Sequence, residues 1–286
     1  MKWPEDLQNW PQSAWSRRVI CPPHRWHVQE AGEGPLVLFL HGAGSATHSW
    51  APVMADLVAS HRVIAIDLPG HGFTALGARN RSGLEEMSED IGRLCAQEAW
   101  QPVLIVAHSA GGAVAMDLTD RHLRRDGVAP PVLAVNPAMD TFEGPAGFVF
   151  PMIAKALSMN PMVPWLFTLG PDAMSRARRL IGSTGSQIPE AQLACYARLL
   201  QDRDHVRGAL SMMAQWSFRT LRARLPETDI RCTFVIGGKD QAVPPHQSQA
   251  VALILKHAER IVLEDLGHLA HEEAPERVLD VIRAQL

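Results

Sequence analysis

Short apolar runs recur along the first half of the chain, separated by segments with helical spacing. Runs of this length that are rich in β-branched residues predict strands. The predicted strands cover residues 25–32, 35–42, 61–70, 101–109 and 131–137. The turn-forming residues 30–35 predict that the first two of these strands are neighbours.

Helical spacing is clearest in residues 83–99, and a second helical stretch covers residues 47–60. In the first of these, apolar positions recur every three or four residues, which places them on one helix face. These positions are Leu84, Met87, Ile91, Leu94 and Cys95. Because apolar strands alternate with helices, the chain is predicted to be an α/β protein with a mostly parallel sheet covered on both faces.

The strand pattern stops after residue 136 and resumes near residue 227. The intervening stretch has several helical segments, seven of the eleven methionines and no convincing strand. Two more strands are predicted in residues 230–240 and 258–268, followed by a helix over 274–285. We therefore predict a core made of residues 1–136 and 227–286, interrupted by a helical cap at 137–226.

Composition and charge narrow the classes of protein. The 286 residues are 47% hydrophobic and 20% charged, which is typical of a soluble globular chain. The formal net charge is −3, and the basic run 121–126 is interpreted as a solvated helix end, so no nucleic-acid partner is predicted. Residues 147–170 are apolar but contain three prolines and a lysine, so no transmembrane segment is predicted.

Cysteine usage and the first residues predict the compartment. The four cysteines are scattered without metal-ligand spacing or a disulfide pattern, which fits a reducing compartment. The start of the chain lacks the apolar core of a secretory signal. We expect a cytoplasmic protein on these grounds.

The stretch "IVAHSAGGAVA", residues 105–115, contains the first candidate for chemistry. Ser109 ends a predicted strand and opens a helix, and small residues surround it. A sharp strand-to-helix turn exposes a serine as a nucleophile and needs small neighbours, usually in the pattern G-x-S-x-G. Here Ala107 replaces the first glycine and Gly111 supplies the second. Ser109 is therefore the predicted nucleophile.

A serine hydroxyl needs a base to act as a nucleophile at neutral pH, and the base needs an orienting acid. Asp240 follows one late strand and His268 follows the last, in the order Ser, Asp, His that this strand–turn–helix arrangement requires. We predict that Ser109, Asp240 and His268 form a catalytic triad. Asp140, which also follows a strand, is the alternative acid.

Backbone amides must stabilise the negative oxygen that forms during acyl transfer. The glycine-rich segment after the second predicted strand and the residue after Ser109 are in position to supply them. The candidate donors are Ala43 and Ala110. Around them, His41, Gly42 and His108 are predicted to line the substrate site, with His41 orienting loops through hydrogen bonds. His271, one turn beyond His268, is expected at the surface.

Cofactor chemistry is not predicted. The histidines are dispersed, and no HExxH pattern or paired histidine and carboxylate cluster is present. The glycine-rich segments do not match a phosphate-binding loop. We therefore expect neither a metal nor a cofactor.

Five segments together resemble the α/β-hydrolase superfamily across essentially the whole chain: "FLHGAGSATHSW", "DLPGHGFT", "AHSAGG", "IGGKDQAVPP" and "LEDLGHLAHEEAPE". The resemblance implies an eight-stranded, mostly parallel sheet, a helical cap inserted after the sixth strand and a pocket above Ser109. Haloalkane dehalogenases of this superfamily use an aspartate nucleophile, so the serine argues against that branch.

A narrower resemblance rests on five segments, three of them in the predicted cap. "WPQSAWSRRVI", "GAGSATHSW", "NPAMDTFEGPAGFVFP", "LIGSTGSQI" and "HVRGALSMMAQW" look like the magnesium-chelatase accessory proteins of bacteriochlorophyll biosynthesis. This resemblance implies a tetrapyrrole-like ligand and an association with magnesium chelatase. Methionines and aromatic residues of the cap, including Trp165 and Met213, are candidates for lining a broad apolar pocket. The alternative is that these residues only pack the cap against the core.

Three functions follow from these observations. The first is a serine hydrolase that cleaves an ester through an acyl-enzyme, within tetrapyrrole metabolism. The second is a carbon–carbon bond hydrolase that uses the same triad. The third is a non-catalytic pigment-binding or chelatase-assisting protein on the same scaffold. The intact triad favours the first.

Overall fold

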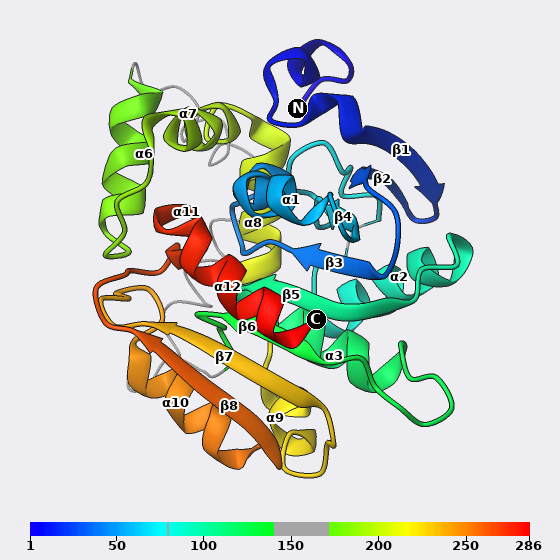
Figure 1. The fold of residues 1–286 in the computed structure, drawn as a ribbon. Helices are drawn as coiled ribbons and strands as arrows, with labels where there is room; N and C mark the ends of the chain where they lie inside the picture. The colour runs from blue at the N-terminus through cyan, green and yellow to red at the C-terminus, as the bar shows by residue number, and fades with distance from the viewer. Residues whose placement is uncertain (79, 140–171) are drawn as a thin grey trace.

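A computed structural model describes residues 1–78, 80–139 and 172–286. Its centre is an eight-stranded sheet with the order β1-β2-β4-β3-β5-β6-β7-β8 (Figure 1). The strands are β1 (Ser16–Cys21), β2 (His24–Ala31), β3 (Leu36–Leu40), β4 (Arg62–Ile66), β5 (Pro102–His108), β6 (Val132–Val135), β7 (Arg231–Gly237) and β8 (His257–Leu263). The pairs β4–β3, β3–β5, β5–β6, β6–β7 and β7–β8 are parallel, whereas β1–β2 and β2–β4 are antiparallel. The predicted α/β class and mostly parallel sheet are confirmed.

The prediction that β2 and β3 are neighbours is wrong. Strand β4 lies between them, pairing in parallel with β3 and antiparallel with β2, with Val28 opposite Ile66. The crossover from β3 through α1 (Ala51–Leu57) returns the chain to the side of β3 that a hairpin would have occupied. Strand β1 was not predicted, because Ser16–Cys21 is only partly buried and carries two arginines.

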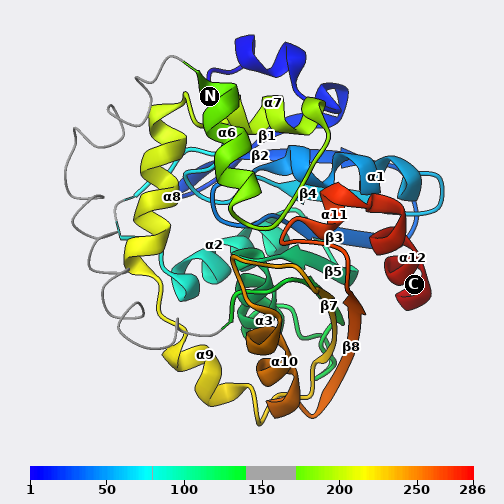
Figure 2. The same ribbon diagram turned by 90° about the vertical axis from the view of Figure 1, so that its left-hand side faces the viewer.

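Helices cover both faces of the sheet, as predicted. One core cluster joins Val37 and Phe39 of β3 to α1 and to α12 (Pro275–Gln285). The alternate residues Leu38 and Leu40 face a second cluster, formed with helices on the other side. Those helices are α2 (Leu84–Gln97), α3 (Ala110–Arg121) and α10 (Pro245–Ile254) (Figures 1 and 2). Successive side chains of β3 therefore point to opposite faces of the sheet and pack into two different core clusters.

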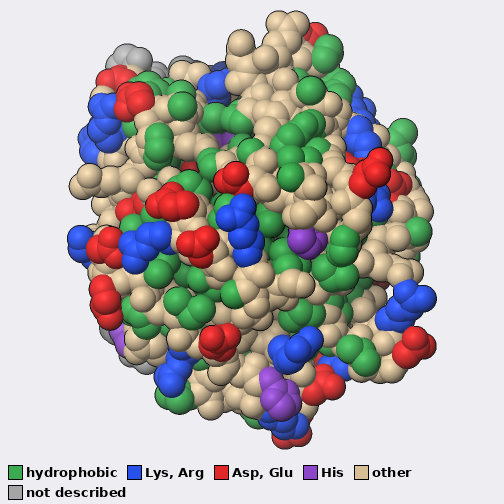
Figure 3. All heavy atoms as spheres, viewed as in Figure 1, with side chains coloured by type: hydrophobic (Ala, Val, Ile, Leu, Met, Phe, Trp, Pro, Cys, Tyr) green, Lys and Arg blue, Asp and Glu red, His purple; other side chains and the backbone are tan. Residues whose placement is uncertain are grey.

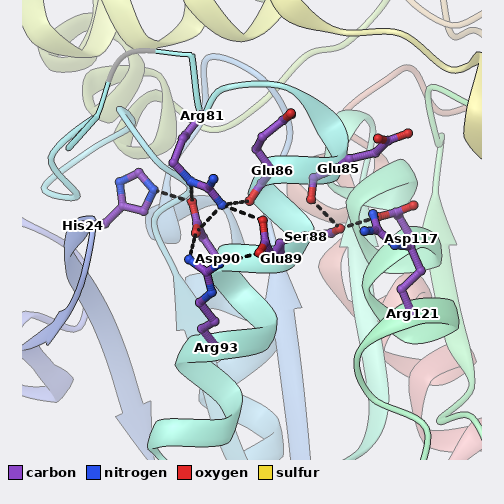
Figure 4. A network of polar contacts seen from close by, with 10 residues as sticks. All are labelled: His24, Arg81, Glu85, Glu86, Ser88, Glu89, Asp90, Arg93, Asp117 and Arg121. Carbon is purple, nitrogen blue, oxygen red and sulfur yellow. Dashed lines mark hydrogen bonds and ion pairs between the residues drawn. The ribbon is translucent and has the colours of Figure 1, made fainter.

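The helical face predicted within residues 83–99 is present in α2. All five of its predicted apolar positions are buried against the sheet. Beside this apolar face α2 carries the buried Asp90, which accepts from His24 Nε2 at 3.0 Å and pairs with Arg81 at 2.7 Å (Figure 4). Ser88 of the same helix donates to Asp117 of α3. These polar contacts join α2 to both β2 and α3.

Within residues 172–230, the structure has four short helices before β7. They are α6 (Ala173–Gly182), α7 (Glu190–Leu199), α8 (Arg203–Gln215) and α9 (Arg219–Arg224). Residues of α6 and α7 form an apolar cluster with Trp10, which follows the helical turn η1 (Glu5–Asn9), so the N-terminal segment lies beside α7 (Figure 1). Helices are present where a cap was predicted, and its boundaries at 137–226 stay a prediction.

Charged side chains of both signs are interspersed over the face of the molecule seen in Figure 3. All four cysteines are free and buried. In the part of the chain that the structure describes, no helix is long and apolar enough to span a bilayer. The apolar stretch 147–170 lies outside the described residues.

Candidate active site

Ser109 occupies a strained turn between β5 and α3. Its backbone angles are φ 51° and ψ −120°, a region that side chains other than glycine rarely adopt. Three hydrogen bonds hold the turn: the Ser109 amide donates to Val135 O at 3.0 Å, and its carbonyl accepts from Gly112 at 2.9 Å and Ala138 at 3.0 Å. Such strain is common at functional sites, where the surrounding structure maintains it.

The small residues around Ser109 are required by close backbone approach. A Cβ on Gly111 would lie 2.5 Å from the carbonyl oxygen of His41, and one on Gly112 would lie 2.6 Å from Cβ of Pro137. Neither position can accept a side chain without moving its neighbours. Ala107, which replaces the first glycine of the pattern, is fully buried in β5. The alanine therefore leaves the turn intact.

The structure brings Ser109, Asp240 and His268 together. His268 Nε2 lies 3.0 Å from Ser109 Oγ, and His268 Nδ1 lies 2.7 Å from Asp240 Oδ2. A carboxylate only accepts, so Nδ1 carries the proton and the Nε2 lone pair faces the serine hydroxyl. Both Asp240 and His268 are buried, whereas Ser109 is half-buried. The arrangement allows proton transfer from the serine to the imidazole.

Each of the three side chains follows a parallel strand. Ser109 comes after β5, Asp240 after β7 and His268 after β8, so all three lie at the carboxyl edge of the sheet. Asp240 is fixed by its own turn, because its Oδ1 accepts from the amides of Ala242 and Val243, each at 2.8 Å. One carboxylate oxygen is thus held by backbone and the other is left for the histidine.

Asn136 is a site residue that the sequence analysis missed. Its Nδ2 donates to the carbonyls of Gly267 at 2.9 Å and His268 at 2.8 Å, and its Oδ1 accepts from Gly237 N at 2.6 Å. Its φ of 44° is also in the left-handed region. Asn136 therefore ties the histidine loop to the end of β7. Asn136 directly follows β6 and lies at the same sheet edge as the triad, and this position could have identified it as a site residue from the sequence.

His108 holds the same loop from the other side. Its Nε2 donates to the His268 carbonyl at 2.9 Å, and its ring lies 4.7 Å from the His268 ring. Burial lowers the pKa of His108 well below its usual value, which keeps the ring neutral. His108 therefore holds the loop of His268, and its predicted place in the lining of the substrate site stays a prediction.

The expectation that His271 lies at the surface is wrong. Its ring is fully buried, 4.3 Å from the Trp50 ring and 4.5 Å from the His108 ring. Burial lowers its pKa to about 3. His271 is on α11 (Ala270–Glu273), and the neighbouring Ala270 belongs to the same core cluster as Trp50. The three-residue spacing from His268 to His271 does not predict this burial, because the burial depends on contacts with distant residues.

The predicted oxyanion segment is a tight turn against Ser109. A Cβ on Gly42 would lie 3.0 Å from Cβ of Ser109, so the backbone passes directly beside the nucleophile. The amide of Ser45 donates to Gly42 O at 3.2 Å, and Gly44 has a φ of 74°, which closes the turn around Ala43. Neither Ala43 nor Ala110 donates its amide to a backbone carbonyl of the described residues.

His41 orients this turn, as predicted. Its Nε2 accepts from the Leu68 amide at 2.9 Å, so Nδ1 carries the proton and donates to Gly42 O at 2.8 Å. Burial lowers the pKa of His41, which maintains the neutral form that both bonds need. His41 therefore connects the turn to the loop after β4.

The remaining predicted residues are placed as follows. Met213 is half-buried on α8. Trp165 and the alternative acid Asp140 lie outside the described residues. Within residues 1–78, 80–139 and 172–286, no three histidine, cysteine, aspartate or glutamate side chains are arranged to hold a metal ion.

Solved structures with the same fold include hydrolases of several kinds. The Cif epoxide hydrolase from Acinetobacter nosocomialis aligns with a TM-score of 0.79 and 20% identity, covering 98% of this chain and 93% of that chain. A thermophilic esterase from Thermogutta terrifontis aligns with a TM-score of 0.75 and 22% identity, covering 94% of this chain and 97% of that chain. At these identities the likeness concerns the fold.

A curated relative is much more similar in sequence. The magnesium-chelatase 30 kDa subunit of Rhodobacter capsulatus is 40% identical over 278 residues, covering 96% of this chain and 95% of its own length. This relative confirms the resemblance noted in the cap segments. The model of the alpha/beta hydrolase family matches residues 37–281, which include all three triad positions. The chain belongs to the α/β hydrolase family.

Proposed function

We propose that the protein is a serine hydrolase that cleaves a carboxylic ester through an acyl-enzyme. The observation that carries the proposal is the continuous hydrogen-bonded chain from Ser109 Oγ through His268 to Asp240. The strained turn that presents Ser109 supports it, because strain of this kind persists only where the structure maintains it. Esterases among the structures of the same fold are consistent with this chemistry.

In the proposed first step, Ser109 Oγ attacks the ester carbonyl carbon while His268 Nε2 takes the hydroxyl proton. The amides of Ala43 and Ala110 stabilise the resulting oxyanion. The carbon–oxygen bond to the alcohol then breaks, and the imidazolium returns its proton to the leaving alkoxide. Asp240 stabilises the imidazolium in between and never takes the proton itself.

In the second step, His268 removes a proton from water, and the hydroxide attacks the acyl carbon. Collapse of this second tetrahedral intermediate breaks the bond to Ser109 Oγ, which regains the proton from His268. The products are a carboxylic acid and an alcohol, and the enzyme returns to its starting state. Every proton passes through Nε2, so the tautomer set by Asp240 is required in both steps.

Covalent labelling tests the nucleophile. A fluorophosphonate probe is expected to modify the native protein at Ser109 only, because this hydroxyl has a base at 3.0 Å. Peptide mass spectrometry after digestion locates the adduct. Heat-denatured protein serves as the control, since the triad geometry is then lost. An adduct on a different residue of the native protein would contradict the proposed nucleophile.

A specific observation also favours a role beside magnesium chelatase. The Rhodobacter capsulatus relative is described as a subunit of that enzyme, and the identity of 40% extends over nearly the whole of both chains. We propose that the protein acts in the cytoplasm on a tetrapyrrole-like ester and associates with magnesium chelatase. Four free, buried cysteines are consistent with a reducing compartment.

Complementation distinguishes catalysis from a purely binding role. In a photosynthetic strain that lacks this gene, the wild-type chain is expected to restore bacteriochlorophyll synthesis, whereas Ser109→Ala is not. Immunoblotting must show equal amounts of both chains. Full restoration by Ser109→Ala would favour the non-catalytic, chelatase-assisting role instead.

A further inference from the structure

A buried polar link joins three segments that lie far apart in the sequence. Tyr196 on α7 places its hydroxyl 3.0 Å from Ser45 Oγ and 2.5 Å from Glu272 Oε1. Ser45 belongs to the turn that contains Ala43, and Glu272 is on α11, directly after His268. All three residues are at most 5% exposed. The link therefore joins the oxyanion turn to α11, the helix that follows the base His268.

The contacts of Ser45 bear on the candidate oxyanion amide. Ser45 N closes the turn by donating to Gly42 O, and Ser45 Oγ is held by Tyr196. Ala43 lies between Gly42 and Ser45, the two residues joined by this hydrogen bond. The direction of the Ala43 amide therefore depends on where Ser45 is held. Misplacing a catalytic donor by about 1 Å can cost about 10²-fold in rate. Tyr196 is thus in a position to affect catalysis without touching the substrate.

A second helix of the same region holds the neighbouring residue of the turn. His205 on α8 accepts from Gly72 N through Nδ1 at 3.1 Å, so its Nε2 carries the proton and donates to Gly44 O at 3.2 Å. Burial lowers the pKa of His205 to about 4 and keeps this donor arrangement at neutral pH. Helices α7 and α8 therefore each hold one side of the oxyanion turn.

We propose that Tyr196 is a positioning residue, a role that rests on the proposed serine hydrolase function. Tyr196 holds the oxyanion turn in place through Ser45 and anchors it to Glu272. The Glu272 carboxyl group is a neutral partner for the Tyr196 hydroxyl at neutral pH, because burial raises the pKa of Glu272 to about 8. The side chain of Tyr196 is kept in place by ring contacts as well, since the His48 ring lies 4.7 Å away. Phenylalanine at this position keeps the ring and removes only the link.

The test compares Tyr196→Phe with the wild type in hydrolysis of p-nitrophenyl butyrate. We expect kcat to fall about tenfold, because the amide is displaced rather than removed, while KM changes less than about twofold. The inhibition constant of a trifluoromethyl ketone, which forms an oxyanion on Ser109, is expected to rise by a similar factor. A purely structural role would change the unfolding midpoint without this split between kcat and KM.

Ser45→Ala provides a second route if Tyr196→Phe fails to fold. It is expected to show the same defects, and the double variant should be no worse than either single one, because both break one link. Ser88→Ala is the matched control, since it removes a buried hydroxyl between α2 and α3 and should leave all three constants unchanged.

The outcomes separate this proposal from the function on which it rests. A wild type that neither cleaves the ester nor reacts with the fluorophosphonate overturns the proposed function and the positioning role together. A reactive wild type with unchanged kcat and inhibition constant in the folded variants overturns the role of Tyr196 alone. The role of Tyr196 is also overturned if Tyr196→Phe and Ser45→Ala change kcat, KM and the inhibition constant no more than Ser88→Ala does.

Discussion

Replacement of Ser109 by alanine is expected to lower kcat/KM for p-nitrophenyl butyrate by about 10⁴-fold or more. The hydroxyl is the group that His268 Nε2 contacts at 3.0 Å, and alanine has no atom that can form the acyl-enzyme. Residual hydrolysis would come from the oxyanion amides acting on bound substrate with water as the nucleophile. Steady-state kinetics with background subtraction measure the effect.

The fold of the Ser109→Ala variant should be unaffected. Both residues have a Cβ, so the strain at a φ of 51° is the same in each. Circular dichroism and the urea midpoint are therefore expected to match the wild type. Ser88→Ala, distant from the site, should keep full activity. A Ser109→Ala variant that retains more than about 1% of wild-type kcat/KM would contradict the nucleophile assignment.

The free energy of unfolding is expected to fall by at least about 3 kcal/mol for each pH unit near pH 5. Burial lowers the pKa of His48 and His271 to about 3 and that of His205 to about 4, against 6.5 when exposed. Near pH 5 the unfolded chain therefore binds three protons at these histidines that the native chain does not. Stability is lost as the pH falls.

Glu272 works in the opposite direction. Its pKa of about 8 lies above the ordinary value of 4.5, so the native chain holds one extra proton in the same pH window. Three protons minus one leaves a net of two, each worth about 1.4 kcal/mol per pH unit. His41, His71 and His108, whose pKa values are also lowered by burial, add to the loss on acidification.

Urea denaturation at pH 7, 6 and 5 in one buffer of constant ionic strength tests this dependence. His271→Gln is expected to lower the slope by about one proton, because it removes one neutral buried imidazole. Val103→Ala is the control, since Val103 is exposed on β5 and carries no titratable group, so the slope should stay unchanged. An unfolding free energy that stays constant from pH 7 to 5 would show that the buried histidines are protonated in the native state.

Local patterns were sufficient for much of the fold and of the site. The apolar positions of α2 are buried as their spacing predicts, and the continuous apolar run of β3 is buried on both sheet faces as predicted. Chain order was equally informative for the triad, because residues that follow parallel strands meet at one edge of the sheet. Ser109, Asp240 and His268 could therefore be named before any coordinates, from three short segments and their order.

Strand pairing and burial of polar groups depended on tertiary contacts. The pattern of β2 and β3 contains no sign that β4 lies between them, since a strand's apolar residues do not specify its neighbour. His271 looks like an ordinary polar residue of a helix and is buried because Trp50 and His108 pack against it. Asn136 acts on three backbone groups that lie 101 to 132 residues away.

By itself, the sequence determined seven of the eight strands, the apolar face of α2, and which three side chains could meet at the sheet edge. These properties follow from periodicity and chain order, both of which are local or topological. Only the tertiary structure decided the pairing of β2 with β4, the burial of His271, and the contacts of Asn136 and Tyr196. These features depend on which distant surfaces pack together, and the spacing of residues along the chain does not specify that packing.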